Sequence, residues 1–278
     1  MDEPLRELAR SHIESGLARI PVFPGIATRA EKVLANPDAG IDEVQELVSR
    51  DPALAAALLR AANSAAFGAR EEISTIREAI VRLGIRRTAQ LVIVFSQHRS
   101  YQMHEPRLQK MAKTLWKYAT ASAVACDWLA RRVGLAQAEP HAMLAGLLHD
   151  VGMLFVLGVL DDVLAKNPDS MQFSNALTLE VIDSLHAEQG DRLLESWSVP
   201  EVFRDVVRHH HDEKVDPNDG LLLVVRIVDR ACHRLGVALG SIVTNEERDE
   251  SEALAIGATN VVLAELEIRI EDAVQLAG

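Results

Sequence analysis

The 278-residue sequence has few of the residues that build disulfide frameworks, thiolate metal sites or nucleic-acid surfaces. Its two cysteines, Cys126 and Cys232, each lie inside an apolar pattern with no second cysteine nearby, which predicts neither a disulfide framework nor a cysteine-based zinc site. Aromatic residues make up only 4%, and 29 Lys plus Arg stand against 41 Asp plus Glu. The net charge of −12 repels phosphate backbones and anionic lipids, so we expect neither nucleic acid nor a membrane as a partner.

Signals for export or membrane insertion are also missing from the sequence. The N-terminal segment MDEPLRELARSHIESG lacks the basic start and apolar core of a secretory signal, so a cytoplasmic location is predicted. One apolar window, 142–160, carries His149 and Asp150 near its centre. Because a central Asp costs about 2.5–3.5 kcal/mol on insertion scales, the window is interpreted as a buried helix of a soluble protein.

The hydrophobic pattern is helical along the whole chain. Apolar residues recur at intervals of three and four, whereas alternating runs bounded by turns are scarce, and this predicts an all-α fold without a sheet. The run LVIVF at 91–95 resembles a strand, but it continues the pattern RRTAQLVIVFSQH without a break. It is therefore also predicted to be a buried helix.

Local signals place several helix boundaries. Asp51 followed by Pro52 predicts a helix from there to about Ala62, and the capping-box pair at 75 and 78 predicts another that ends before Gly84. The polar stretch 96–109 is the candidate join between an N-terminal lobe, 1–100, and a second lobe, 101–278. Further turn-rich breaks are expected at 134–140, 167–174, 198–200 and 212–220, and the charged segment 244–252 is expected to precede one or two closing helices.

Ionisable residues in apolar surroundings mark a candidate site. They are His149-Asp150, His186 with Glu188, the triple His209-His210-His211, and Asp229. Imidazole and carboxylate together suit zinc, iron or manganese, and helices of a bundle can bring such side chains onto one ion. Taken singly, each residue also fits an ordinary role as a helix cap, a hydrogen-bonded core histidine or a solvated turn.

The segment AMLAGLLHDVGM resembles the signature of the HD superfamily of metal-dependent phosphohydrolases, with His149-Asp150 as its doublet. Other segments resemble the HDOD family, a group of HD-related regulatory domains, in both order and spacing over about residues 15–235. These segments are LARIPVFPGI (17–26), DPALAAALLRAANSAAFG (51–68), ISTIREAIVRLG (73–84), LWKYATASAVA (115–125), HAEQG (186–190), WSVPEVF (197–203) and the histidine run. The resemblance implies an all-helical, two-lobed fold and a role in bacterial signalling.

The resemblance also implies a degenerate site for a divalent metal such as iron, manganese, zinc or magnesium. Its candidate ligands are His149, Asp150, His186, His210, His211 and Asp229, with His209 as an alternative for one of the paired histidines. Tyr118 stands where an HD protein has its first ligating histidine, and Met153 stands where catalytic relatives have the Lys of HDxGK. No GYP tripeptide follows the histidines, unlike in HD-GYP phosphodiesterases. No catalytic residue is therefore expected.

Two functions remain open from the sequence, and a third is weaker. The first is a non-catalytic regulatory module that binds a signalling protein or a small ligand. The second is a metal-dependent phosphohydrolase for a nucleotide or cyclic dinucleotide, in which the ion generates hydroxide. A helix-turn-helix interpretation of IRRTAQ (85–90) is disfavoured, because two arginines on an acidic protein are more typical of a solvated face.

Overall fold

The computed structural model describes residues 3–15, 18, 24–166, 174–240 and 246–277, and within these ranges all regular structure is helical. This confirms the predicted all-α fold. The first helices are α1 (Glu3–Glu14), α2 (Gly25–Ala35), α3 (Ile41–Ser49), α4 (Pro52–Ala62), α5 (Ile76–Leu83) and α6 (Ile85–Ser96), with the short 3₁₀ helices η1 (Ala65–Phe67) and η2 (Gln97–Tyr101). They are followed by α7 (Pro106–Arg132), α8 (Glu139–Leu148), α9 (Val151–Lys166), α10 (Asn175–Ser196), α11 (Glu201–His209), α12 (Gly220–Arg234), α13 (Glu246–Ala255), α14 (Asn260–Val274) and η3 (Gln275–Ala277).

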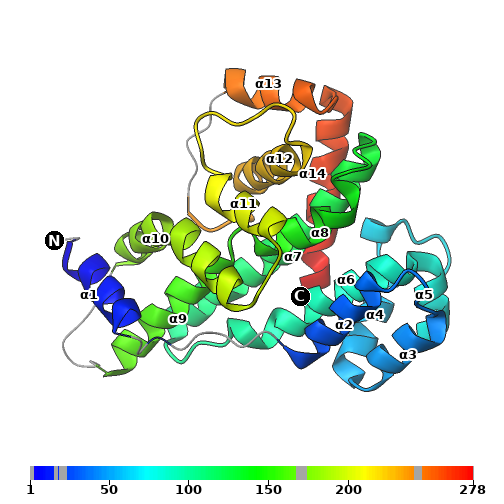
Figure 1. Ribbon diagram of the computed structural model, residues 1–278, viewed down its shortest axis with the longest axis horizontal. Helices are drawn as coiled ribbons and strands as arrows, with labels where there is room; N and C mark the ends of the chain where they lie inside the picture. Colours follow the sequence, from blue (N-terminus) through cyan, green and yellow to red (C-terminus); the bar gives the residue numbers. More distant parts are fainter. Residues whose placement is uncertain (1–2, 16–17, 19–23, 167–173, 241–245, 278) are drawn as a thin grey trace.

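Helices α2 to α6 pack against one another as a small lobe, and their ends follow the sequence signals (Figure 1). Asp51 accepts hydrogen bonds from the amides of Ala53 and Leu54, which satisfies donors that the first turn of α4 leaves free. Both halves of the capping box between Thr75 and Glu78 are present at the start of α5. The predicted helices at 52–62 and 76–83 are therefore confirmed, and so is the helical state of 91–95 within α6.

The second lobe is organised around the 27-residue helix α7. Helices α8, α12 and α14 pack along α7, α9 pairs with α10, and α11 lies against α8 and α10. Helix α1 contacts α9 rather than the small lobe, and Figure 1 shows it on the opposite side of the molecule from α2 to α6. The division of the chain at residue 100 stays a prediction.

The apolar window at 142–160 differs from its prediction as one helix. Helix α8 ends at Leu148 and α9 begins at Val151, so the chain turns at the His149-Asp150 doublet. By length and composition the stretch 139–166 could cross a membrane, but 89% of its apolar window is buried inside the protein. Packing against other helices accounts for its apolar character.

The charged segment at 244–252 also differs from its prediction. From Glu246 onward it is itself helical, as part of α13, rather than a linker before the closing helices. The reason is that Glu252 is buried and binds two arginines of α12, Arg226 and Arg230. The predicted breaks near 134–140, 198–200 and 212–220 do separate helices, whereas most of the break at 167–174 lies outside the described residues.

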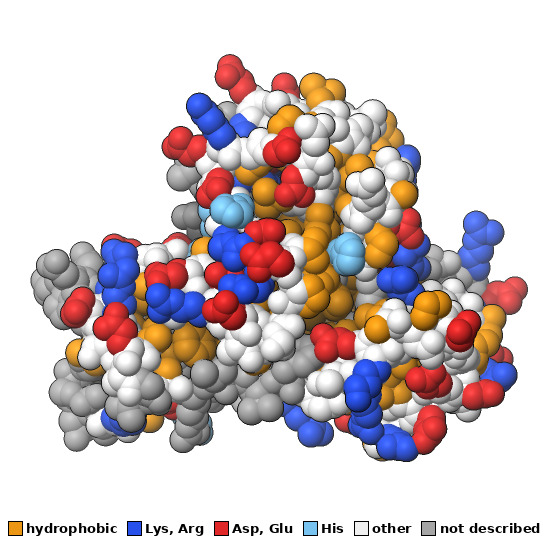
Figure 2. Space-filling view, in the orientation of Figure 1, with side chains coloured by type: hydrophobic (Ala, Val, Ile, Leu, Met, Phe, Trp, Pro, Cys, Tyr) orange, Lys and Arg blue, Asp and Glu red, His pale blue; other side chains and the backbone are white. Residues whose placement is uncertain are grey.

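Acidic and basic side chains are interspersed on the face shown in Figure 2, with no broad basic field there. Many of them form exposed pairs, such as Arg192 with Glu188. Such pairs contribute little to stability, about 0–1 kcal/mol each. The buried ion pairs, such as that of Arg226 with Glu252, lie inside the second lobe.

Candidate metal centre

Two glycines bring the doublet against its neighbouring helices. A Cβ on Gly146 would lie 2.5 Å from the carbonyl oxygen of Ser122, so α8 can approach α7 this closely only with glycine at this position. A Cβ on Gly152 would lie 1.8 Å from the carbonyl oxygen of His186, which sets the same requirement between α9 and α10. The glycines of the AGLLHDVG segment therefore place the turn between α8 and α9 close to both α7 and α10.

Three histidines are oriented in the same way by the backbone. The Nδ1 atoms of His149, His186 and His210 lie 3.0, 2.9 and 2.9 Å from the carbonyl oxygens three residues earlier in the chain. Because a carbonyl oxygen can only accept, each Nδ1 carries the proton and each Nε2 is left to face the cluster. This is how backbone groups fix the ring orientation of metal-binding histidines in other proteins.

One part of the cluster, which we call the open half, consists of Asp150, His186, His210 and His211. Asp150 Oδ1 lies 3.2 Å from His210 Nε2 and 3.5 Å from His186 Nε2, and His186 Nε2 lies 3.1 Å from His211 Nε2. One ligand atom from each residue falls within 4.8 Å of all the others. His211 is exposed and the other three are buried, so the open half has one side toward solvent.

The other part, the Tyr118 half, consists of His149, Tyr118 and Asp229. The Tyr118 hydroxyl lies 2.7 Å from His149 Nε2 and donates to Asp229 Oδ1 at 2.6 Å. All three side chains are at least 98% buried. Asp150 adjoins this half as well, with Oδ2 3.4 Å from His149 Nε2. The phenol, which has a single proton to donate, therefore lies against the ligand atoms of both His149 and Asp229 and gives its hydrogen bond to Asp229.

Electrostatics in the open half centre on Asp150. Burial would raise the pKa of this carboxyl, but His149, His210 and His186 around it hold the pKa well below its ordinary value. Burial likewise lowers the pKa of His210, but the adjacent Asp150 carboxylate raises it overall. Although part of the His211 side chain is exposed, desolvation of its ring beside the cluster and the neighbouring His210 lower its pKa to about 3. His211 therefore stays neutral at pH 7, as a metal ligand must.

In the Tyr118 half, burial raises the pKa of Tyr118 well above its ordinary value, and the Asp150 and Asp229 carboxylates raise it further. The phenol stays neutral. Burial would raise the pKa of Asp229, but His233 and His149 lower it to about 2. This half is therefore a neutral phenol hydrogen-bonded to an ionised carboxylate.

The residues of the open half fit a divalent metal ion. Asp150 Oδ1 and His210 Nε2 are buried and make no hydrogen bond of acceptable geometry with any described residue, although they lie 3.2 Å apart. The raised pKa of His210 shows that its Nε2, 3.2 Å from the carboxylate oxygen, favours a positive charge at this position, and a metal cation between the two atoms would supply one in place of a proton. Three imidazoles and one carboxylate suit zinc, iron or manganese.

The structure brings all six candidate residues together, from the α8–α9 turn, α10, α11 with the turn after it, and α12. It leaves out Glu188, which is exposed and pairs with Arg192, and His209, which is exposed and pairs with Asp212. Met153 is buried in α9. Whether the six residues bind a metal stays a prediction.

Sequence reasoning missed two contributors to the cluster. His233 lies one turn after Asp229 on α12, with Nε2 3.3 Å from Asp229 Oδ1, and the four-residue spacing is the signal that could have identified it. Arg226 donates to the carbonyl oxygen of His210 at 2.7 Å and is held by Glu252 of α13 at 2.8 Å. No local pattern pairs Arg226 with a residue 26 positions away.

An all-helical fold with a His-Asp doublet at a helix junction, surrounded by further histidines, defines an HD-type helical protein. The HDOD domain family model matches residues 20–213, and the chain belongs to the HDOD family. Asp229 lies beyond the matched range. The family resemblance seen in the sequence is thereby confirmed.

The similarity to solved structures supports the helical fold and does not define an activity. An uncharacterized protein of Treponema pallidum (strain Nichols) is 28% identical over 198 residues, which are 69% of this chain and 38% of that protein, so the chain spans about two fifths of this curated relative. An HDOD domain protein of unknown function from Geobacter sulfurreducens has a TM-score of 0.73 at 24% identity, covering 99% of this chain and 97% of its own. A protein of Shewanella amazonensis SB2B, provisionally named a metal-dependent phosphohydrolase, has a TM-score of 0.76 at 17% identity with the same coverage.

Proposed function

We propose that this protein is a regulatory HDOD module of the bacterial cytoplasm that acts by binding a signalling protein or a small ligand, without hydrolysing phosphate esters. One observation carries the proposal: the Tyr118 hydroxyl lies between His149 and Asp229, at 2.7 and 2.6 Å. A metal-dependent hydrolase needs an ion that polarises the phosphoryl group and generates hydroxide. Here a neutral phenol takes up two of the candidate ligands.

The charges around the cluster support the same proposal. Met153, at the position of the family's catalytic lysine, can neither hold a phosphate charge nor donate a proton. Arg226 is the cation that contacts the cluster's backbone, and its guanidinium is already bound to Glu252 and to the carbonyl oxygen of His210. Neither residue offers a free positive charge to an anionic substrate. An ion in the open half would then serve structure or signalling.

The second candidate is a metal-dependent phosphohydrolase for a nucleotide or cyclic dinucleotide. The open half favours it, because buried Asp150 and His210 atoms lack hydrogen-bond partners among the described residues and exposed His211 gives the half access to solvent. The provisional name of the Shewanella amazonensis protein points the same way. Against it stands the loss of the Tyr118 half as a set of ligands.

A hydrolysis assay with three proteins separates the two candidates. Wild type, Tyr118→His/Met153→Lys and Asp150→Ala would each be tested with manganese, iron and magnesium on cyclic dinucleotides and nucleoside phosphates. We expect the wild type to be silent and metal analysis to show an ion lost in Asp150→Ala. Wild-type turnover that Asp150→Ala abolishes would overturn the regulatory proposal. A gain of activity in the double variant would support loss of an ancestral centre.

A further inference from the structure

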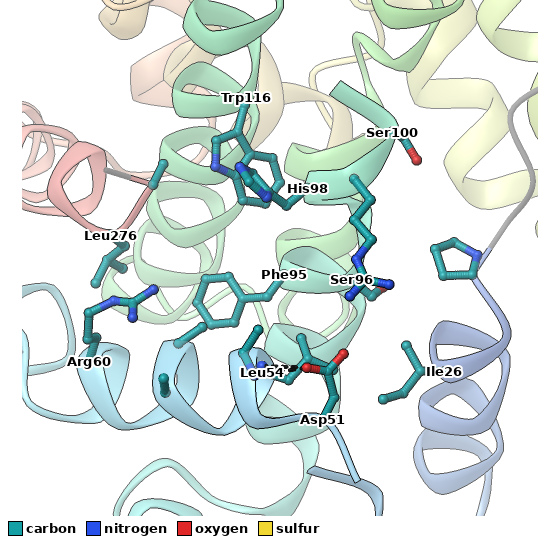
Figure 3. Close-up of a pocket in the computed structure, with 16 residues that line it drawn as sticks. Ile26, Asp51, Leu54, Arg60, Phe95, Ser96, His98, Ser100, Trp116 and Leu276 are labelled. Carbon is teal, nitrogen blue, oxygen red and sulfur yellow. Dashed lines mark hydrogen bonds between the residues drawn. The ribbon is translucent and has the colours of Figure 1, made fainter. Parts of the chain in front are cut away.

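A cavity of about 620 Å³ lies between the small lobe and the second lobe, and none of its lining residues belongs to the His/Asp cluster. It is lined by residues of α2, α4, α6, η2, α7 and η3. Its volume falls within the roughly 300–1,000 Å³ of small-molecule sites. Figure 3 shows that residues from these separate elements surround one central space. The cavity is large enough for a small organic ligand.

The wall of the cavity is mainly apolar. Leu54, Phe95 and Leu276 line it from three different elements, and the Phe95 ring points toward its centre (Figure 3). The indole of Trp116 packs edge-on against the ring of His98, with centroids 5.1 Å apart, and forms another part of the wall. Burying an apolar ligand here would be favourable by about 25 cal/mol per Å² of area removed from water.

Unpaired positive charge borders this apolar wall. Arg60 of α4 and Arg99 of η2 both line the cavity, and among the described residues neither guanidinium has a hydrogen-bond or ion-pair partner. The carboxylate of the lining, Asp51, already accepts from two amides of α4. On a protein with a net charge of −12, two free guanidinium groups beside one cavity form a local site of opposite sign.

We propose that this cavity binds a small amphiphilic anion. Its carboxylate or phosphate pairs with Arg60 or Arg99, two exposed arginines of the lining whose planar guanidinium groups are well suited to such anions. Its aliphatic body lies on Leu54, Phe95 and Leu276. Apolar contact supplies most of the affinity, and the arginines select for charge.

Helix α7 connects the cavity with the His/Asp cluster. Trp116 lines the cavity, and Tyr118, two residues later, bonds His149 and Asp229. Residues two apart on a helix point about 200° from each other, so the two sites flank opposite sides of α7. If the protein has the proposed regulatory function, a small amphiphilic anion is the class of ligand that it senses. Binding itself rests on the cavity alone.

Calorimetric titration with octanoate and octyl phosphate tests the proposal, with 1-octanol as the uncharged control. We expect one site per chain for at least one anion, and affinity lowered at least about tenfold in Arg60→Gln/Arg99→Gln, which is about 1.4 kcal/mol. Arg86→Gln, an exposed arginine outside the cavity, should bind as wild type. Ala56→Phe, at an exposed position of the lining, should obstruct binding.

Several outcomes would overturn the proposal. They are no saturable binding of either anion, equal affinity for 1-octanol, or equal loss in Arg86→Gln. Arginine-dependent binding of AMP without binding of either alkyl anion would refute an aliphatic ligand. The titration is repeated with Asp150→Ala, which alters the His/Asp cluster but not the cavity. Retained octanoate binding there would keep this proposal intact even if the wild type proved to be a hydrolase.

Discussion

The two halves of the His/Asp cluster meet at Asp150 and are built from the same kinds of side chain, but they differ in how their polar atoms are satisfied. In the Tyr118 half, one phenol donates to Asp229 Oδ1 and its oxygen lies 2.7 Å from His149 Nε2. In the open half, Asp150 Oδ1 and His210 Nε2 have no hydrogen-bond partner among the described residues. A single buried side chain thus distinguishes a half whose ligand atoms are covered by a phenol from a half whose ligand atoms remain open to an ion.

The two halves of the cluster meet the requirements of their buried polar atoms in different ways. Buried polar atoms without hydrogen-bond or ionic partners destabilise the fold, so the polar atoms of each half require partners. In the Tyr118 half, the phenol supplies a hydrogen bond to the Asp229 carboxylate without a metal. The open half retains a composition that a bound ion would stabilise, and binding to the folded state adds directly to the free energy of unfolding.

The largest expected effect comes from adding a side-chain atom at the close contact between α9 and α10. In Gly152→Ala the new Cβ would meet the His186 carbonyl oxygen at 1.8 Å, and the contact is with backbone, which cannot rotate away. We expect the free energy of unfolding to fall by about 3 kcal/mol, the upper end of ordinary overpacking, with metal retention weakened as His186 moves. Urea unfolding and metal analysis measure both.

Gly158→Ala on the same helix is the matched control for that variant. Nothing lies within 4 Å of its Cβ position, so the substitution should stabilise the helix by about 0.5–1 kcal/mol. Equal behaviour of the two alanine variants would show that the close approach at Gly152 is not what positions the open half.

A smaller effect is expected from removing the hydroxyl of the Tyr118 half. Tyr118→Phe removes the hydrogen bond that the buried Asp229 accepts from the phenol, and leaving such a group unsatisfied costs about 1–3 kcal/mol of unfolding free energy. Tyr101→Phe, a buried tyrosine packed on Trp116, is the control and should change stability by less than about 0.5 kcal/mol. An unchanged free energy of unfolding in Tyr118→Phe would mean that the hydroxyl is not an important hydrogen-bond partner in this half of the cluster.

The smallest expected effect is a change in pH dependence in the metal-free protein. The pKa of His211 is about 3 in the folded state against an ordinary 6.5, so between these values the unfolded chain binds a proton that the folded protein does not. The contribution of His211 to the free energy of unfolding therefore decreases as the pH falls from about 6.5 toward 3. His211→Gln should make this decrease less steep, in urea titrations at pH 7 and pH 5 with chelator. An unchanged slope would contradict the assigned environment of His211.

Much of the fold was predictable because its signals are local. Asp51 and the capping box at Thr75 define helix starts within four residues, and the three-and-four periodicity identified 91–95 as helix. The misreadings have non-local causes. The doublet ends α8 where hydrophobicity alone suggested a continuous helix, and Glu252 holds α13 onto arginines of α12 that no local pattern assigns to it.

The candidate site was predictable in its residues but not in its division into halves. Family resemblance supplied six positions, and the structure brings them together. Tyr118 was recognised as a replacement for an imidazole, but its bonds to His149 and Asp229 depend on the packing of α7, α8 and α12, which sequence does not specify. The arginines of the inter-lobe cavity belong to different elements and left no sequence signal.

The most direct test of the account is anomalous diffraction from crystals of the wild-type protein grown with manganese. The account predicts one ion per chain, bound by Asp150, His186, His210 and His211, and an additional ion in Tyr118→His. A wild-type ion bound between His149, Asp150 and Asp229 would contradict it, because the Tyr118 hydroxyl would then not close that half to metal.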